Sequence, residues 1–250
     1  MPHSIAVVEA RLELEHLRAT LVRKLGARSL LELVVRRVTD CARIDGVVVL
    51  VVDESEAGIA RELVPSDVPV RVATAPETIG RFVEMLDEYR PDGVVRVRAE
   101  NPFIEPEFID HLVTAAAEEP GCDYVGYRLR DGRPAAGTSL GLFAEWCRPE
   151  ALRRVARLAR TPADRDGFTQ YMVAHPGAFS LRFLPAPAGL DRDDLRLTVE
   201  SEEDWLHAEV IYEALGPDEF DWKRIARLLN GQPRLRERMA RLNRDFAPTD

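Results

Sequence analysis

The chain has 250 residues, of which 46% are hydrophobic and 31% are charged, and its formal net charge is −9. This composition indicates a globular rather than a disordered protein. The negative charge argues against nonspecific nucleic-acid binding, which needs a basic surface. No apolar run approaches the ~20 residues of a membrane helix. The N-terminus runs directly into a predicted strand without a signal peptide, so we expect a cytoplasmic protein.

The first half of the chain alternates predicted strands with predicted helices. Residues 46–52 are almost continuously apolar, as expected for a central parallel strand covered on both faces. Ser29 and Glu32 have the spacing of a capping box, which predicts the start of a helix. Strands are predicted at 4–10, 46–52, 70–72 and 94–98, and helices at 29–38, 57–63, 76–86 and 106–119. This alternation predicts an α/β fold with a doubly wound, mostly parallel sheet.

The pattern changes in the second half. Asp131 and Gly132 indicate a hairpin turn, and Ser201 is a helix cap. Strands are predicted at 123–128, 138–143 and 194–199, and helices at 149–158, 164–174, 202–215, 222–229 and 233–243. We expect a single domain over residues 1–250, with a helical and hairpin excursion at about 124–190 and a C-terminal helical extension at 217–250. The three cysteines, Cys41, Cys122 and Cys147, have no paired spacing and are expected to be reduced and mostly buried.

Two glutamates follow predicted strands. Glu100 comes just after the strand at 94–98, and Glu200 stands at the end of the predicted strand at 194–199. In open α/β sheets, ligands bind outside the carboxyl ends of the strands. The sequence therefore predicts the functional site near Glu100.

Several stretches resemble the sugar cytidylyltransferases, in particular the spore-coat polysaccharide branch that is related to the CMP-acylneuraminate synthetases. The resemblance rests on residues 10–11, 25–32, 81–82, 94–96, 101–110, 164–171 and 194–204. It implies a Rossmann-like nucleotidyltransferase fold and transfer of CMP from CTP to an acidic sugar or similar acceptor, with Mg²⁺ as cofactor. The small-molecule partners would be the nucleotide and the sugar.

The resemblance also implies roles for individual residues. The nucleotide-binding positions would be Arg11, Arg18, Lys24 and Arg81. The substrate-binding positions would be Arg96, Arg165, Thr169 and Arg196. The metal ligands would be Glu100 and Glu200, where the family has two aspartates.

The loop after the first strand departs from the family pattern. The family's glycine, second arginine and lysine positions are Glu13, His16 and Thr20 here. A loop that holds phosphates needs glycine for close approach of backbone amides, and it needs cations to offset the anionic charge. Residues 13–24 also read as a partly helical, solvated segment. Three hypotheses remain: an active cytidylyltransferase, a catalytically inactive binding or assembly partner, and a relative acting on another anionic ligand.

Two further expectations concern metal and assembly. Without a cation, two facing carboxylates repel each other, so one of the pair formed by Glu100 and Glu200 should have a raised pKa. Bound Mg²⁺ should then raise the melting temperature. The resemblance also implies a homodimer with a two-fold axis at the helices predicted for 149–158 and 164–174. Their apolar residues are Leu152, Val155, Leu158, Phe168, Tyr171 and Met172.

Overall fold

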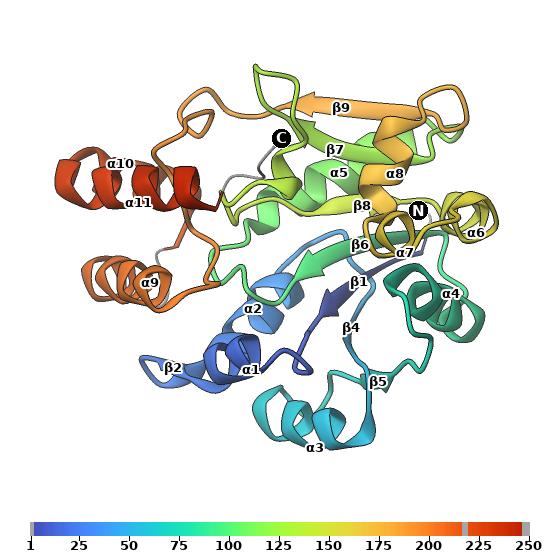
Figure 1. The fold of residues 1–250 in the computed structure, drawn as a ribbon, viewed down its shortest axis with the longest axis horizontal. Helices are drawn as coiled ribbons and strands as arrows, with labels where there is room; N and C mark the ends of the chain where they lie inside the picture. The colour runs from blue at the N-terminus through green and yellow to red at the C-terminus, as the bar shows by residue number, and fades with distance from the viewer. Residues whose placement is uncertain (1–2, 217–219, 247–250) are drawn as a thin grey trace.

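A computed structural model describes residues 3–216 and 220–246 of the chain. Seven strands form one sheet in the order β5-β4-β1-β6-β8-β7-β9, and helices cover both of its faces (Figure 1). The strands of this sheet are β1 (Ser4–Glu9), β4 (Gly46–Val51), β5 (Val70–Val72), β6 (Gly93–Arg98), β7 (Tyr124–Arg128), β8 (Glu145–Cys147) and β9 (Leu181–Pro185). A separate small hairpin joins β2 (Lys24–Leu25) to β3 (Arg28–Ser29).

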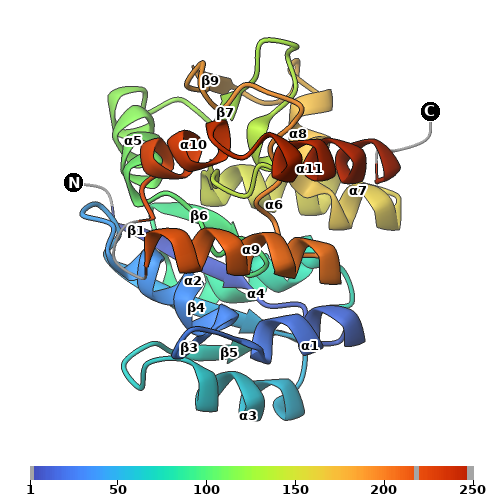
Figure 2. The same ribbon diagram turned by 90° about the vertical axis from the view of Figure 1, so that its left-hand side faces the viewer.

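Eleven α-helices are assigned in the described part of the chain. They are α1 (Glu15–Val22), α2 (Leu30–Thr39), α3 (Glu54–Leu63), α4 (Thr78–Tyr89), α5 (Pro106–Glu118), α6 (Pro149–Leu158), α7 (Pro162–Asp166), α8 (Phe168–Ala174), α9 (Glu202–Leu215), α10 (Trp222–Asn230) and α11 (Pro233–Asp245). One 3-10 helix, η1 (Ala135–Gly137), follows β7. Helices α9, α10 and α11 lie together on one side of the molecule (Figure 2).

The sheet is parallel except for β8, which is antiparallel to both β6 and β7. Strands β4 and β5 extend the sheet from one side of β1, and β6 pairs with the other side of β1. The direction of winding therefore reverses between β1 and β6. Such a reversal opens a crevice at the carboxyl ends of the two strands. The predicted doubly wound, mostly parallel sheet is confirmed.

Each face of the sheet has its own hydrophobic core. On one face, α2 and α5 bury residues such as Val34 and Ile109. On the other face, α4 and α8 bury Phe82 and Phe168, whose ring centroids lie 4.9 Å apart. Burial of a side chain of this size contributes about 1.5–3 kcal/mol. Residues far apart in sequence thus hold the two helical layers on the sheet.

Most predicted element positions and helix caps of the first half are confirmed. Ser29 Oγ accepts a hydrogen bond from the backbone N–H of Glu32 at 3.0 Å, as the capping pattern predicted. The stretch after β1 contains helix α1, so the partly helical reading of residues 13–24 is also confirmed. All three cysteines are free and buried. Within residues 3–216 and 220–246, no helix has both the length and the apolar character that crossing a bilayer requires.

Two strand predictions in the second half are wrong. Residues 138–140 form a bend and a turn, residues 141–143 and 195–199 have no regular structure, and the sheet contains β8 and β9 instead. The backbone of the 194–199 segment bonds to loops: Leu197 N–H donates to Ser139 O, and Val199 N–H donates to Glu100 O. The predicted helix at 164–174 is divided into α7 and α8. Of the predicted C-terminal extension, residues 217–219 and 247–250 lie outside the described residues.

Candidate active site

Arg11 and Glu100 meet at the point where the winding of the sheet reverses. Arg11 lies two residues after β1, and Glu100 lies two residues after the neighbouring strand β6. The guanidinium Nη2 of Arg11 is 2.6 Å from Oε1 of Glu100, and the Glu100 side chain is only 1% exposed. The sheet topology therefore places a buried carboxylate and its arginine partner at the edge where ligands bind in this class of fold.

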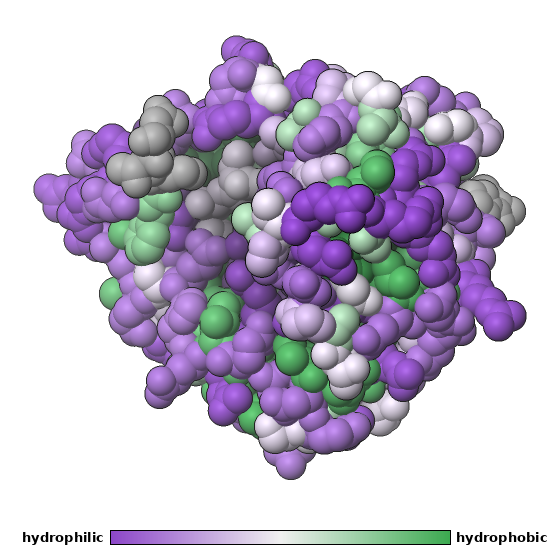
Figure 3. All heavy atoms as spheres, turned by 45° about the vertical axis from the view of Figure 1, so that its right-hand side comes forward, coloured by the Kyte–Doolittle hydropathy of each residue, from purple (hydrophilic) through white to green (hydrophobic). Residues whose placement is uncertain are grey.

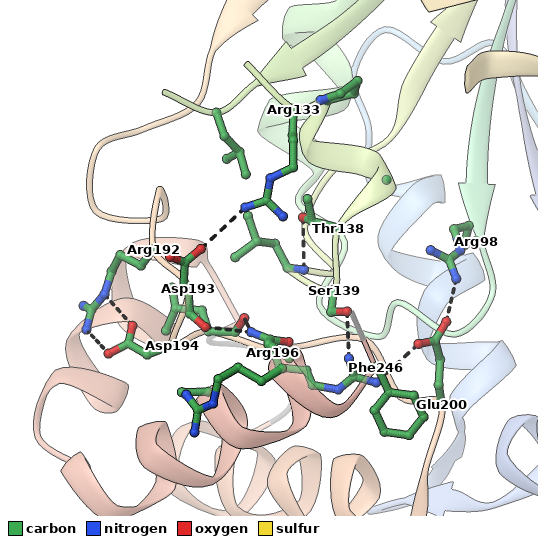
Figure 4. Close-up of a pocket in the computed structure, with 18 of the residues that line it drawn as sticks. Arg98, Arg133, Thr138, Ser139, Arg192, Asp193, Asp194, Arg196, Glu200 and Phe246 are labelled. Atoms are coloured by element: carbon green, nitrogen blue, oxygen red, sulfur yellow. Dashed lines mark hydrogen bonds and ion pairs between the residues drawn. The ribbon is translucent and has the colours of Figure 1, made fainter. Parts of the chain in front are cut away.

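Arg98 joins Glu100 to Glu200. Its Nη2 lies 2.8 Å from Oε1 of Glu100 and 2.6 Å from Oε1 of Glu200. The structure thus brings together the two glutamates that are 100 positions apart in the chain, but a guanidinium group lies between them. Figure 4 shows Arg98 directed at Glu200 from the end of β6.

A buried ion pair supports Glu200 from the other side. Arg196 and Asp204 have side chains that are 0% exposed, and their two contacts are 2.6 Å (Nε to Oδ1) and 3.0 Å (Nη2 to Oδ2). Nη2 of Arg196 also lies 3.3 Å from Oε2 of Glu200, while Nη1 donates to Ser139 Oγ at 2.7 Å. A bidentate arginine–carboxylate pair of this kind has a fixed geometry. We refer to Arg11, Arg98, Arg196, Glu100, Glu200 and Asp204 together as the arginine–carboxylate cluster.

A pocket of about 940 Å³ opens beside this cluster (Figure 4). Arg98, Arg196 and Glu200 form part of its wall, and Thr138 and Phe246 line it as well. Three more arginines, Arg133, Arg192 and Arg244, also line the pocket. The carboxylates of Glu145, Asp193, Asp194 and Glu200 line the pocket too, so its formal charges nearly balance. Its guanidinium groups can bind carboxylate or phosphate oxygens of a ligand in pairs.

A second cluster of polar side chains, centred on Arg96, fixes the pocket wall near α8. Arg96 donates to Glu9 Oε2 from both Nε and Nη2, at 3.0 and 2.9 Å, and its Nη1 lies 3.4 Å from Thr169 Oγ1. Its guanidinium carbon is 4.6 Å from the ring centroid of Phe168. Burial by itself would lower the pKa of Arg96, but the negative charges of Glu9 and Glu145 outweigh it and raise that pKa. Thr169 and Glu145 both line the pocket, so this group sets its shape.

Four of the predicted binding residues make contacts away from the cluster. Arg18 lies 3.9 Å from Glu56, and Arg81 donates to backbone carbonyls just before its own helix. Arg165 pairs with a glutamate at the start of α4, at 3.4 Å. Lys24 is exposed on β2, in the hairpin that contacts α9. Of the predicted set, Arg11, Glu100, Glu200 and Arg196 gather in the cluster, and Arg96 and Thr169 stand beside it.

The residues around Glu100 do not fit the Mg²⁺ site that the resemblance implied. Magnesium needs near-octahedral oxygen ligands at ~2.0–2.1 Å. Here Oε1 of Glu100 already accepts from Arg11 and Arg98. Two like unit charges at 4 Å repel by about 4 kcal/mol at an effective dielectric near 20, and a divalent ion beside these guanidinium groups would meet more. Among the described residues, no group of three or more His, Cys, Asp or Glu side chains is arranged to hold a metal ion.

Glu100 also lacks the raised pKa expected of one member of a repelling carboxylate pair. Burial alone would raise its pKa, but the charges of Arg98 and Arg11 outweigh burial and hold the pKa below its usual value. The expected repulsion between the two glutamates is offset by the guanidinium group of Arg98, which contacts both of them. Glu100 is therefore an ionised partner of two arginines.

The most important residue that the site prediction missed is Arg98. Along β6, Arg96, Arg98 and the following Glu100 alternate with apolar residues, so the three side chains lie on the same side of the strand. That alternation is visible in the sequence and is the signal that identifies Arg98. Asp204 lies four residues after Glu200, in the first turn of α9, and belongs to the stretch 194–204 that carries the resemblance. Its spacing of three residues from the cap Ser201 is the signal that marks it in the sequence.

Comparisons with known proteins agree with this architecture. A family model described as cytidylyltransferase matches residues 5–182. The spore coat polysaccharide biosynthesis protein SpsF of Bacillus subtilis (strain 168) is 26% identical over 235 residues, covering 91% of this chain and 94% of that protein. An uncharacterized protein of Methanocaldococcus jannaschii is 27% identical over 202 residues, covering 80% and 79% of the two chains.

Solved structures share the fold at low sequence identity. A cytidylyltransferase from Leptospira borgpetersenii superposes with a TM-score of 0.82 at 18% identity, covering 94% of this chain and 97% of that chain. CMP:2-keto-3-deoxy-manno-octonic acid synthetase, solved with CTP, gives a TM-score of 0.66 at 12% identity, covering 85% and 99%. The family match spans well over half of the chain, and these structures share its fold. The chain belongs to the cytidylyltransferase family.

Proposed function

We propose that this protein transfers CMP from CTP to a hydroxyl group of an acidic sugar, in the cytoplasm, as a step in the synthesis of a surface polysaccharide. Family membership supports the reaction class, and the similarity to SpsF supports a role in polysaccharide synthesis. The observation that carries the proposal is the pocket of about 940 Å³ beside Glu100, lined by five arginines. Its size is in the range of small-molecule sites, and its guanidinium groups suit the carboxylate of an acidic sugar.

In this reaction the acceptor hydroxyl oxygen forms a bond to the α-phosphorus of CTP. The bond from that phosphorus to the bridging oxygen breaks, pyrophosphate leaves, and the hydroxyl proton passes to water. Enzymes catalyse such transfers mainly by positioning the reactants and by stabilising charge. Arg11 and Arg98 are the cations nearest Glu100 and would bind phosphate oxygens. Arg196 and Thr169, on the pocket side, would hold the acceptor.

A second candidate function is binding without transfer, with the protein serving as an assembly partner. The first loop favours it. Where the resembled family holds phosphates with glycine amides, this chain forms α1, and the Arg18 N–H already donates to Leu14 O at 2.8 Å. The Glu13 carboxylate extends from the same segment to within 3.9 Å of Arg81. Amides committed to a helix and an added carboxylate both weaken a phosphate-binding loop.

Calorimetry and a pyrophosphate-release assay separate the two functions. We expect CTP to bind with a Kd of about 1 mM or tighter, equivalent to ~4 kcal/mol, and more tightly than ATP, GTP or UTP. Sugar acids, but not the matching neutral sugars, should then give pyrophosphate release. Arg11→Gln should weaken CTP binding about tenfold, as loss of a charge-assisted contact does. The exposed Arg61→Gln, on α3, is the control and should leave binding unchanged.

Binding of CTP without pyrophosphate release would favour the assembly function. If no nucleotide binds at all, with or without sugar acid, the proposed transfer reaction is wrong.

We further propose a homodimer that forms through α6 to α8. Four of the six apolar residues expected at its interface, Leu152, Val155, Phe168 and Met172, are fully buried in the chain's own core. Leu158 is 41% exposed and remains available for a partner, as does the partly exposed Tyr171. The surface turned forward in Figure 3 is mainly hydrophilic, with hydrophobic residues scattered among hydrophilic ones.

Light scattering at micromolar concentration tests the dimer. We expect the wild type to have the mass of two chains and Leu158→Glu to have the mass of one, because a buried charge disfavours the contact. Leu206→Glu introduces the same change at an exposed position of α9 and should remain dimeric. A wild type with the mass of one chain contradicts the proposal.

A further inference from the structure

Arg98 lies between Glu100 and Glu200, the two residues that the resemblance implies as ligands of a divalent cation. One of its nitrogens contacts the carboxylates of both Glu100 and Glu200, at 2.8 and 2.6 Å. The contact is built into the fold, because Arg98 is the last residue of β6 and Glu100 follows two residues later. The guanidinium group therefore bridges the two carboxylates as a shared metal ion would.

The charge around Glu100 also equals that of a divalent ion. Arg11 and Arg98 contribute one positive charge each and both contact Oε1 of Glu100. Unlike a metal, each guanidinium presents several N–H donors in a planar fork, which matches the paired oxygens of a carboxylate or phosphate group. Arg98 is 29% exposed and lines the pocket, so part of its fork can reach a ligand.

The two glutamates differ in a way that assigns them different roles. Glu100 is 1% exposed and accepts hydrogen bonds from Arg11 and Arg98, so it positions the two cations. Glu200 is 29% exposed and lies in the pocket wall, with Oε1 on Arg98 and Oε2 on Arg196 (Figure 4). A carboxylate thus already occupies the two guanidinium groups that an anionic ligand in this pocket would use.

We propose that Arg98, with Arg11, replaces the divalent cation in this chain, and that Glu200 occupies the ligand's place until an anionic group displaces it. The group is a pair of oxygens from a carboxylate or phosphate, which bridges Arg98 and Arg196 without metal. The identification of that group with the acidic sugar or with CTP rests on the proposed function. The displacement of Glu200 by an anionic group does not. Arg98 is then a binding residue, and Glu200 is an internal competitor.

The test is anion binding measured by calorimetry with EDTA present. Pyrophosphate probes phosphate, and D-glucuronate probes carboxylate, with D-glucose as its neutral match. We expect Glu200→Gln to raise the affinity for one of the two anions by roughly tenfold, because the variant no longer occupies its own site. Arg98→Lys keeps the charge but loses the fork, and should lower the affinity about tenfold. Which anion responds identifies the source of the ligand group.

Glu202→Gln is the matched control for the competitor role. It removes a carboxylate two residues away that is 70% exposed and pairs with Arg23 outside the cluster, so it should leave the affinity unchanged. A melting curve of each variant checks that the fold is intact. Since Arg98→Lys retains a cation beside Glu100, it is preferred to a neutral substitution that would leave that carboxylate with one partner.

The inference is overturned if anions bind only after Mg²⁺ is added, or if Glu200→Gln binds them no better than the wild type. These results are distinct from a failure of the proposed function. Pyrophosphate release that needs Mg²⁺ and is lost in Glu200→Gln would leave the transfer reaction standing and refute the replacement of the metal. Anion binding that strengthens in Glu200→Gln, without pyrophosphate release from CTP, would support the replacement of the metal and refute the transfer reaction.

Discussion

Arg196→Met is expected to lower the melting temperature by about 10 °C, which corresponds to roughly 3–5 kcal/mol of unfolding free energy for a chain of this size. The reason is the pair that Arg196 forms with Asp204, in which both side chains are fully buried. Methionine fills most of the space but leaves the Asp204 carboxylate buried without its cation. The loss of Arg196 also removes a contact to Glu200 at 3.3 Å and a hydrogen bond to Ser139.

The control is Arg36→Met on α2, where the arginine pairs with Glu32 one turn away at the surface. An exposed pair at this spacing contributes about 0.3–0.5 kcal/mol, so the melting temperature should change by no more than one or two degrees. Thermal denaturation followed by circular dichroism measures both variants. If the two melt at the same temperature, the buried pair does not stabilise the fold in the way that its geometry indicates.

Gly141→Ala is expected to destabilise the protein by about 3 kcal/mol, from backbone strain and overpacking together. Gly141 has a φ of 65°, and a Cβ atom there would lie 2.6 Å from the carbonyl carbon of Leu197 and from the backbone nitrogen of Thr198. Backbone atoms cannot move aside as a flexible side chain can. The segment that would have to shift carries Arg196 and leads into Glu200, so anion binding should weaken as well.

Gly132→Ala separates the two causes. Gly132 also has a positive φ, 91°, but a Cβ atom there meets nothing within 4 Å. This variant should therefore lose only the conformational part, about 1–2 kcal/mol. Chemical denaturation of both proteins gives the comparison. Equal losses would show that Gly141 does not seat the 194–199 segment.

The sequence predicts the first half of the fold well because the signals there are local. The apolar run that forms β4 and the cap at Ser29 each depend on residues within one or two turns of each other. Alternating strands and helices then leave few topologies open, because parallel strands need crossover connections. The resemblance to cytidylyltransferases extended the fold prediction to the whole chain, and the family model confirms the family over residues 5–182.

Local signals fail for 194–199 because an extended backbone and a sheet strand have the same residue pattern. Alternating apolar residues in this segment are buried, as they would be in a strand. Whether such a segment joins the sheet depends on which backbone lies beside it. Here the neighbours are the loops around Ser139 and Glu100, and the sheet edge is completed by β9, which pairs with β7 over Leu181–Pro185.

The site shows the same division. The sequence, read with its resemblance, determined that Glu100 and Glu200 belong to one place at the carboxyl edge of the sheet, and the structure brings them together through Arg98. It could not determine what lies between them. The chain has 34 lysines and arginines, almost all of them arginine, and a guanidinium group can reach a carboxylate from many backbone positions.

Only the tertiary structure decided which arginine meets which carboxylate. Arg18 and Arg165, assigned to the site by the resemblance, form their ion pairs elsewhere, while the unassigned Arg98 bridges the two glutamates. The physical reason is that ion pairing depends on distance and burial, which long-range contacts set and local sequence does not encode. The fold class thus follows from patterns within each segment, and the charge at the centre of the site follows from how the segments meet.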